Sequence, residues 1–161
     1  MMSDCMNGVL TLALRGATSS LHIIAYKENS MPLAFPALMT LLAVLWYFYT
    51  TFHVARAHAK CKIYAPVMTG DPGLERAVRV QTNTLEQIVA FLPAMWIYAW
   101  FGNPRWAAIA CGVWIVGRII YAVGYWEDEK KRTAGFLITV LALAAVWIAA
   151  LVSVIRALMI E

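Results

Sequence analysis

The chain has 161 residues, of which 62% are hydrophobic and 14% are charged, and its mean hydropathy is +0.68. A soluble domain averages about 45–50% apolar and about 25% charged residues. The composition therefore excludes an ordinary soluble domain and predicts an integral membrane protein of one domain. The net charge of +4 comes mainly from Lys and Arg in two short loops, without a basic segment interleaved with aromatic residues. We therefore expect no nucleic-acid partner.

The cysteines offer neither a disulfide framework nor a metal site. There are three of them, Cys5, Cys61 and Cys111, and no two are close in sequence. Metal ligands and paired cysteines usually occur at short, regular spacings. The sequence also lacks the motifs of hydrolases, metalloenzymes and nucleotide-binding proteins. We therefore predict no metal site.

The chain is predicted to have two parts. Residues 1–30 are an N-terminal extension, either a weak interfacial helix or a poorly ordered segment, and they lack the pattern of a signal peptide. Residues 31–161 form the membrane domain.

Four helices are predicted, over residues 31–55, 74–101, 105–126 and 133–155. Each is long enough to cross roughly 30 Å of hydrocarbon, so the fold class is all-α, a four-helix membrane bundle. Pro93 is expected to kink the second helix and free a backbone carbonyl. Lys and Arg gather in the connections between helices one and two and between helices three and four. The positive-inside rule places both connections in the cytoplasm.

Polar residues mark one face of the second helix. At about 100° per residue, five side chains fall on that face and Gln81 points nearly the opposite way. The five are Arg76, Arg79, Asn83, Glu86 and Gln87. Ionisable groups within a span are costly, and they usually face a partner or a wet cavity. This face is therefore a candidate binding site that opens toward the cytosol.

The third helix carries a matching face, with Arg118, Tyr121 and Tyr125 at positions i, i+3 and i+7. Its glycines Gly112, Gly117 and Gly124 offer close helix contacts. Together the two faces hold cations, amides, one carboxylate and two phenols, which suit an anionic, peptide-like small molecule. Arginine pairs with carboxylates, and a cation can hold a thiol as its thiolate.

A structural role for the same charges is the alternative. In that interpretation Glu86 forms an ion pair, either with Arg79 on its own helix or with Arg118 across to the third helix.

Three motifs, in order and spacing, resemble a known family. They are Thr-Gly-Asp-Pro from Thr69, the run ERAVRVQTNTLEQ from Glu75, and GRIIYAVGY from Gly117. The chain is identified by them as a member of the membrane-associated proteins in eicosanoid and glutathione metabolism, the MAPEG family. That family includes microsomal glutathione transferases and leukotriene-forming glutathione synthases. The resemblance covers residues 33 to about 157, and it implies a homotrimer with three glutathione sites between subunits.

The resemblance also implies roles for individual residues. Those expected to contact glutathione from one subunit are Arg79, Asn83, Glu86, Gln87, Tyr121 and Tyr125. Gln81 would contact it from the neighbouring subunit, and Arg132 would be the catalytic residue that stabilises the thiolate. Arg56 resembles a further carboxylate-binding arginine, although the loop after it differs in length. Arg76 and Arg118 match motif arginines for which a structural role stays open.

The expected function is a membrane-bound glutathione transferase, with glutathione peroxidase activity as a second capability. Its substrates would be glutathione and a lipophilic electrophile or hydroperoxide drawn from the bilayer. Gln87 stands where leukotriene-forming members carry a tyrosine, which favours a general detoxifying activity. One alternative is a non-catalytic protein that binds lipid or glutathione. A small transporter is disfavoured, because the spans show no inverted repeat with broken half-helices.

Overall fold

The computed structural model describes residues 33–160, so the predicted extension over residues 1–30 lies outside the described residues. The chain divides into two units, Met1–Ala34 and Phe35–Glu161. The second unit is all-helical over its described residues, which confirms the predicted fold class.

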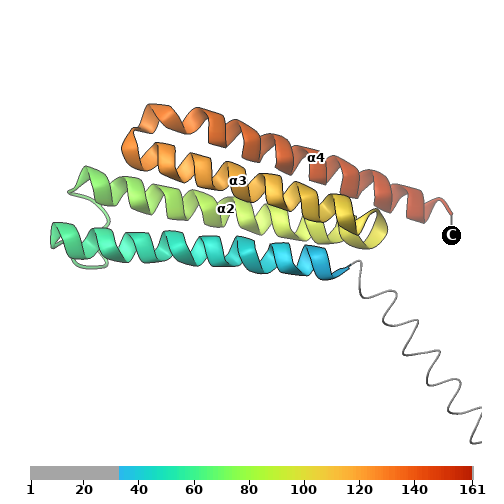
Figure 1. Ribbon diagram of the computed structural model, residues 1–161, viewed down its shortest axis with the longest axis horizontal. Helices are drawn as coiled ribbons and strands as arrows, with labels where there is room; N and C mark the ends of the chain where they lie inside the picture. Colours follow the sequence, from blue (N-terminus) through green and yellow to red (C-terminus); the bar gives the residue numbers. More distant parts are fainter. Residues whose placement is uncertain (1–32, 161) are drawn as a thin grey trace, which may run out of the picture. The chain divides into compact units, whose positions relative to one another are not determined.

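Four long helices and one short 3-10 helix make up the bundle, and the long helices run side by side (Figure 1). Their bounds are Leu33–Cys61 for the first helix, Pro72–Phe101 for α2, Pro104–Glu127 for α3, Glu129–Arg132 for the 3-10 helix η1, and Thr133–Leu158 for α4. The first helix runs past the predicted end at residue 55. It stops at Cys61, before Lys62, whose φ of 56° lies in the left-handed region that ends many helices.

Side-chain caps define where α2 and α3 begin. The Leu74 N–H donates to the Asp71 carboxylate at 2.9 Å, and Pro72 occupies the first turn. The N–H groups of Arg105 and Trp106 donate to the Asn103 side-chain oxygen at 3.0 and 3.2 Å. Such caps satisfy donors that have no partner within the helix. The turn at Asn103 is short, so α2 and α3 become antiparallel neighbours.

Pro93 leaves α2 continuous from Pro72 to Phe101. The indole N–H of Trp147, on α4, donates to the Ala90 carbonyl at 3.3 Å. The carbonyl that loses its helix donor to Pro93 is that of Val89, so the Trp147 bond is made to the next carbonyl along the helix.

Glycines bring α3 and α4 close together. A Cβ added at Gly135 would collide with the backbone of Tyr121, and one at Gly117 would lie 2.8 Å from side-chain atoms of Ile138 and Thr139. The close contacts predicted at Gly117 and Gly124 are confirmed, whereas a Cβ at Gly112 would meet nothing nearer than the Met39 sulfur at 4.0 Å. Gly135 therefore fixes the distance between α4 and the Tyr121 backbone.

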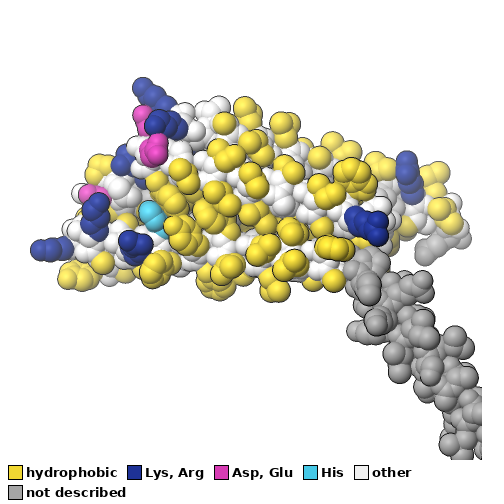
Figure 2. Space-filling model, viewed as in Figure 1, with side chains coloured by type: hydrophobic (Ala, Val, Ile, Leu, Met, Phe, Trp, Pro, Cys, Tyr) yellow, Lys and Arg dark blue, Asp and Glu magenta, His cyan; other side chains and the backbone are white. Residues whose placement is uncertain are grey.

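The outer surface of the bundle is apolar along its length. Figure 2 shows hydrophobic side chains covering the flank, while most charged side chains gather at the end where α2 begins. Large apolar residues are widely exposed, such as Leu41, Trp100 and Leu141 at 67–69%. Exposed apolar surface on this scale needs a partner or a bilayer.

Three helical runs are long and apolar enough to cross a membrane: Leu33–Cys61, Pro104–Glu127 and Glu129–Leu158. α2 has comparable length, but its first half is polar. Four membrane spans were predicted, and three of the four helices have the length and apolar composition of a span. The polar half of α2 is the segment that carries the predicted site.

Candidate functional site

A cavity of about 220 Å³ lies among α2, α3, η1 and the start of α4. Its wall is formed by Arg79, Asn83, Tyr121, Arg132 and Phe136. The sequence singled out Arg79, Asn83 and Tyr121 as candidate binding residues and Arg132 as the candidate catalytic residue. They come from three different segments of the chain, and the fold brings them around one space.

Arg118 is buried at 0% exposure behind this wall, between α2 and α3. It donates through Nη1 to the Asn83 Oδ1 at 3.0 Å and through Nη2 to the Thr84 Oγ1 at 2.7 Å. Its guanidinium carbon lies 4.2 Å from the centre of the Tyr121 ring, a cation–π arrangement. Arg118 thus holds two wall residues, Asn83 and Tyr121.

Glu86 forms neither of the ion pairs considered from the sequence. It is exposed and accepts a hydrogen bond from the Asn83 Nδ2 at 3.2 Å. Within residues 33–160 the ion pair found is that of Lys131 with Glu127 at 2.8 Å. Among the described residues Glu86 therefore pairs with neither Arg79 nor Arg118, and Asn83 bonds to both Glu86 and Arg118.

Arg132 and Tyr121 belong to the wall, and Tyr125 lies next to both of them without lining the cavity. The Tyr121 and Tyr125 rings are buried, and their centroids lie 5.6 Å apart. Arg132 is exposed, its Nη1 donates to the Tyr125 hydroxyl at 3.5 Å, and its guanidinium carbon lies 5.3 Å from the Tyr125 ring centre. A guanidinium has five N–H donors, so Arg132 keeps most of them available for an anion in the cavity.

The two glutamines of α2 lie outside the cavity wall. Gln87 is buried and accepts a hydrogen bond from the Trp114 indole N–H at 3.3 Å. Gln81 donates to the Tyr47 hydroxyl of the first helix at 3.0 Å. Gln81 therefore turns toward the first helix, while Arg79 and Asn83, two residues away on either side, line the cavity.

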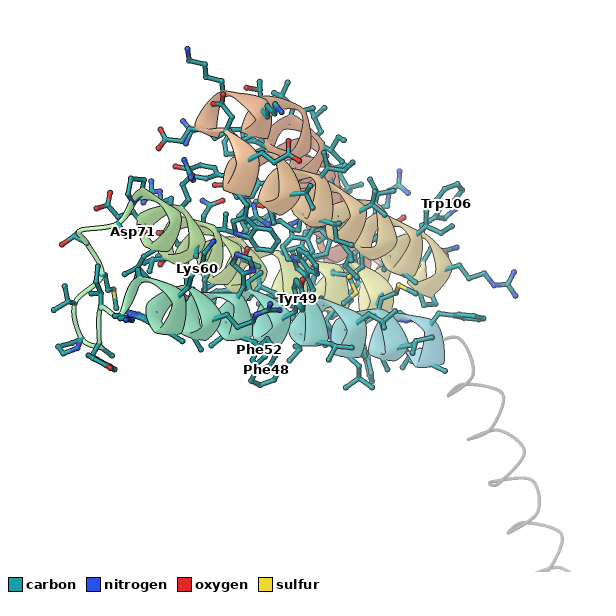
Figure 3. The ribbon with its side chains drawn as sticks, turned by 60° about the vertical axis from the view of Figure 1, so that its left-hand side comes forward. Phe48, Tyr49, Phe52, Lys60, Asp71 and Trp106 are labelled. Carbon is teal, nitrogen blue, oxygen red and sulfur yellow. The ribbon has the colours of Figure 1, made fainter. Side chains whose placement is uncertain are left out.

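Arg56 and Arg76 belong to a different space. A cavity of about 960 Å³ lies between the end of the first helix and the start of α2, and both arginines line it. Its other lining residues are Tyr49, His53, Ala57, Lys60, Cys61, Asp71, Pro72, Gly73, Leu74 and Trp126. In Figure 3, Tyr49 and Lys60 lie on the side of the first helix that faces α2, and Phe48 and Phe52 point away. Within one subunit, the fold does not bring Arg56 to the wall that holds Arg79.

Three residues of the site escaped the sequence reasoning: Thr84, Trp114 and Phe136. Thr84 and Trp114 are buried hydrogen-bond partners of Arg118 and Gln87, and Phe136 closes the cavity from α4. Thr84 lies about 100° around the helix from Asn83 but three residues before Gln87, and this i, i+3 spacing is a signal that could have found it. A Trp or Phe in an apolar helix carries no such signal, because packing is its usual role.

The fold and the cavity define an all-helical integral membrane protein with an arginine-lined polar site toward its charged end. Residues 36–152 match the MAPEG family, and the chain belongs to that family.

Named relatives agree with this assignment. An uncharacterized protein of Synechocystis sp. is 43% identical over 122 residues, which cover 76% of this chain and 89% of the relative. Human microsomal glutathione S-transferase 2 is 35% identical, with 62% of this chain and 68% of the relative covered. Bovine leukotriene C4 synthase is 33% identical, with 61% of this chain and 65% of the relative covered. The resemblance stated from the motifs is therefore confirmed.

Proposed function

We propose that the protein is a membrane-bound glutathione transferase, with glutathione peroxidase activity toward lipophilic hydroperoxides. The observation that carries the proposal is the cavity in which Arg79, Asn83, Tyr121 and Arg132 meet. Relatives named microsomal glutathione S-transferase 2 and leukotriene C4 synthase support glutathione as the ligand.

The chemistry of the wall suits glutathione, which carries two carboxylates, two peptide groups and a thiol. The Arg79 guanidinium matches a carboxylate, and the Asn83 amide matches a peptide group. Arg132 supplies a cation with free N–H donors beside the Tyr125 hydroxyl. In the proposed complex Arg132 stabilises the thiolate, which is the nucleophilic form of the thiol.

The size of the cavity supports a site shared between subunits. Pockets that enclose a small ligand usually measure about 300–1,000 Å³, whereas this cavity measures about 220 Å³. A tripeptide would extend beyond it. A neighbouring subunit would complete the site, with Gln81, Arg56 and the cavity around Arg56 and Arg76 as its available polar surface. We propose a shared site between subunits on this basis, and a homotrimer because the MAPEG resemblance implies three subunits.

Two reactions follow from one thiolate. With an electrophile, the sulfur forms a bond to carbon, and the leaving group departs with the bonding electrons. With a hydroperoxide, the sulfur attacks the terminal oxygen, the O–O bond breaks, and the alkoxide takes a proton to become an alcohol. The glutathione sulfenic acid then reacts with a second glutathione to give the disulfide and water. The protein positions the thiolate and stabilises its charge.

The apolar flank would concentrate a lipophilic co-substrate next to the site. We further propose that the connection after the first helix and the one around η1 face the cytosol. The gathering of Lys and Arg at that end supports this orientation. Glutathione would then enter from the cytosol and the co-substrate from the bilayer.

The test uses the purified full-length protein in detergent and in lipid. Glutathione binding is measured by calorimetry, and thiolate formation by its ultraviolet absorbance band. Turnover is measured with an aryl halide and with a lipid hydroperoxide. We expect a thiolate band and turnover with both substrate classes. Glutathione binding without turnover of either substrate would instead favour the non-catalytic binding protein.

A further inference from the structure

We propose that Arg118 is a positioning residue that holds Asn83 and Tyr121 in the orientation that binds glutathione, without itself touching the ligand. This inference rests on the proposed function, because it assigns a role in the same site. Its evidence is separate, since Arg118 does not line the cavity and sequence reasoning left its role open.

The bonds around Asn83 fix the orientation of its amide. Its Oδ1 accepts from Arg118 at 3.0 Å, and its Nδ2 donates to Glu86 at 3.2 Å. A flipped amide would put its NH₂ against the guanidinium and its oxygen against the carboxylate, and both contacts would be lost. An amide group has two N–H donors and two acceptor positions, so Asn83 keeps one of each for a ligand.

Tyr121 is held by the same guanidinium. The Arg118 guanidinium carbon lies 4.2 Å from the ring centre, and Tyr121 is buried at 3% exposure while still lining the cavity. One side chain therefore restrains two of the five wall residues. Thr84 in turn anchors Arg118 at 2.7 Å from the side away from the cavity.

A buried cation without a carboxylate partner is an expensive way to join two helices. Burying an arginine costs free energy unless its charge and its donors are matched. Arg118 bonds to two neutral oxygens, and its Nε has no partner among the described residues. An apolar residue would join α2 and α3 at lower cost. What an apolar residue cannot do is fix the orientation of the Asn83 amide.

Two variants and one control test the role. Arg118→Met removes the guanidinium but keeps an unbranched, buried side chain. Thr84→Val removes the anchor of Arg118 and alters no residue of the cavity wall. The matched control is Thr50→Val, because Thr50 is also a buried threonine, at 1% exposure, and bonds the Tyr47 carbonyl in the first helix. Arg118→Lys asks whether a charge without the planar fork is sufficient.

The readouts are thermal stability and calorimetric dissociation constants for glutathione and S-methylglutathione, measured on the folded oligomer. We expect Arg118→Met to weaken both ligands by a similar factor, roughly 10- to 100-fold. Thr84→Val should weaken both by a smaller factor, and Arg118→Lys should recover only part of the loss. Thr50→Val should bind both ligands as the wild type does. A purely structural role would lower the melting temperature and leave the dissociation constants of the folded protein unchanged.

Two results would overturn the inference. One is wild-type affinity in folded Arg118→Met and Thr84→Val. The other is a loss confined to glutathione and absent for S-methylglutathione, which would mean that Arg118 acts on the thiolate charge. If Arg118→Met fails to fold, the comparison of Thr84→Val with Thr50→Val still decides the matter. Failure of the wild-type protein to bind glutathione would instead refute the proposed function.

Discussion

At the residue scale, the two exposed arginines of the cavity wall have different proposed roles: Arg79 binds a carboxylate and Arg132 stabilises the thiolate. Arg79, on α2, makes no hydrogen bond or ion pair with another described side chain, so its guanidinium is available to a ligand. Arg132, at the end of η1, is steered by the Tyr125 hydroxyl and ring. A free arginine suits a carboxylate, and an arginine held in one orientation suits an atom whose charge changes during the reaction.

Arg79→Ala should therefore weaken glutathione binding by roughly 1–3 kcal/mol, the size of a lost charge-assisted hydrogen bond. Stability should change little, because Arg79 is exposed and has no partner among the described side chains. Calorimetry on the folded oligomer gives the answer. Arg105→Ala is the control. Arg105 is also an exposed arginine, but it lies at the start of α3, whereas the cavity is lined by Tyr121 near the end of α3. Equal affinity in Arg79→Ala and Arg105→Ala would contradict the assignment.

Arg132→Ala should lower kcat far more than it raises the KM for glutathione, because the lost interaction grows as the thiolate forms. Arg132→Lys should recover only part of the rate, since an ammonium lacks the planar fork. Lys131 is the matched control. It is the adjacent cation, and it is exposed and paired with Glu127 at 2.8 Å, away from the cavity wall. If Lys131→Ala and Arg132→Ala slowed conjugation equally, Arg132 would be only one of several loop charges.

At the element scale, helical periodicity predicted which faces meet but not which atoms bond. Spacing alone put Arg79, Asn83 and Tyr121 on facing sides of α2 and α3, and the cavity brings them together. The structural alternative offered Glu86 as a possible partner of Arg118, whereas its partners are Asn83 and Thr84. Periodicity fixes the angle of a side chain about its helix. It leaves open the axial offset between two helices, which decides between residues one turn apart.

The ends of elements were predictable only where a local signal exists. The Asp71-Pro72 and Asn103-Pro104 pairs predict the starts of α2 and α3, because each places an N-cap residue before a proline in the first turn. The first helix was expected to end at residue 55 because the apolar stretch ends there, yet it continues to Cys61. Leaving the hydrocarbon does not break a helix. The helix stops where Lys62 adopts positive φ, and no residue type announces that.

Gly135 connects helix packing to the site. It lies against the backbone of Tyr121, whose side chain lines the cavity, so an added methyl group must push α4 and α3 apart. Gly135→Ala should destabilise the protein by about 1–3 kcal/mol, the usual cost of overpacking. It should also weaken glutathione binding. Thermal unfolding and calorimetry on the same preparation measure both effects.

Gly112→Ala is the matched control, because a Cβ there meets nothing nearer than 4.0 Å. In an open helical position alanine is favoured over glycine by about 1 kcal/mol, so this variant should be slightly stabilised with unchanged binding. Similar losses in Gly135→Ala and Gly112→Ala would mean that glycine matters on α3 and α4 for a reason other than close contact.

At the scale of the whole molecule, Gln81 and the cavity wall point to opposite sides of α2. Gln81 bonds to Tyr47 of the first helix, whereas Arg79 and Asn83 line the cavity with α3 and η1. If both sides of α2 serve glutathione, one subunit cannot bring them to one molecule, because a helix holds its two faces about 10 Å apart. The proposed trimer resolves this, since each glutathione would meet one face from each of two subunits.

The arrangement predicts how mixed oligomers behave. Arg79→Ala removes a proposed carboxylate contact, and Gln81→Glu adds a negative charge where the neighbour would face an anionic ligand. A subunit that carries both changes should spoil its own site and that of its neighbour. When it is co-expressed in equal amount with wild-type subunits, about a quarter of the sites should bind glutathione, since a working site needs two wild-type subunits in a closed ring. If both residues served the same subunit's site, about half of the sites would bind.

Native mass spectrometry establishes the composition of the oligomers, and calorimetry counts the sites. An active monomer, or a binding stoichiometry of one half, would remove Gln81 from the neighbour's site and with it the shared-site arrangement.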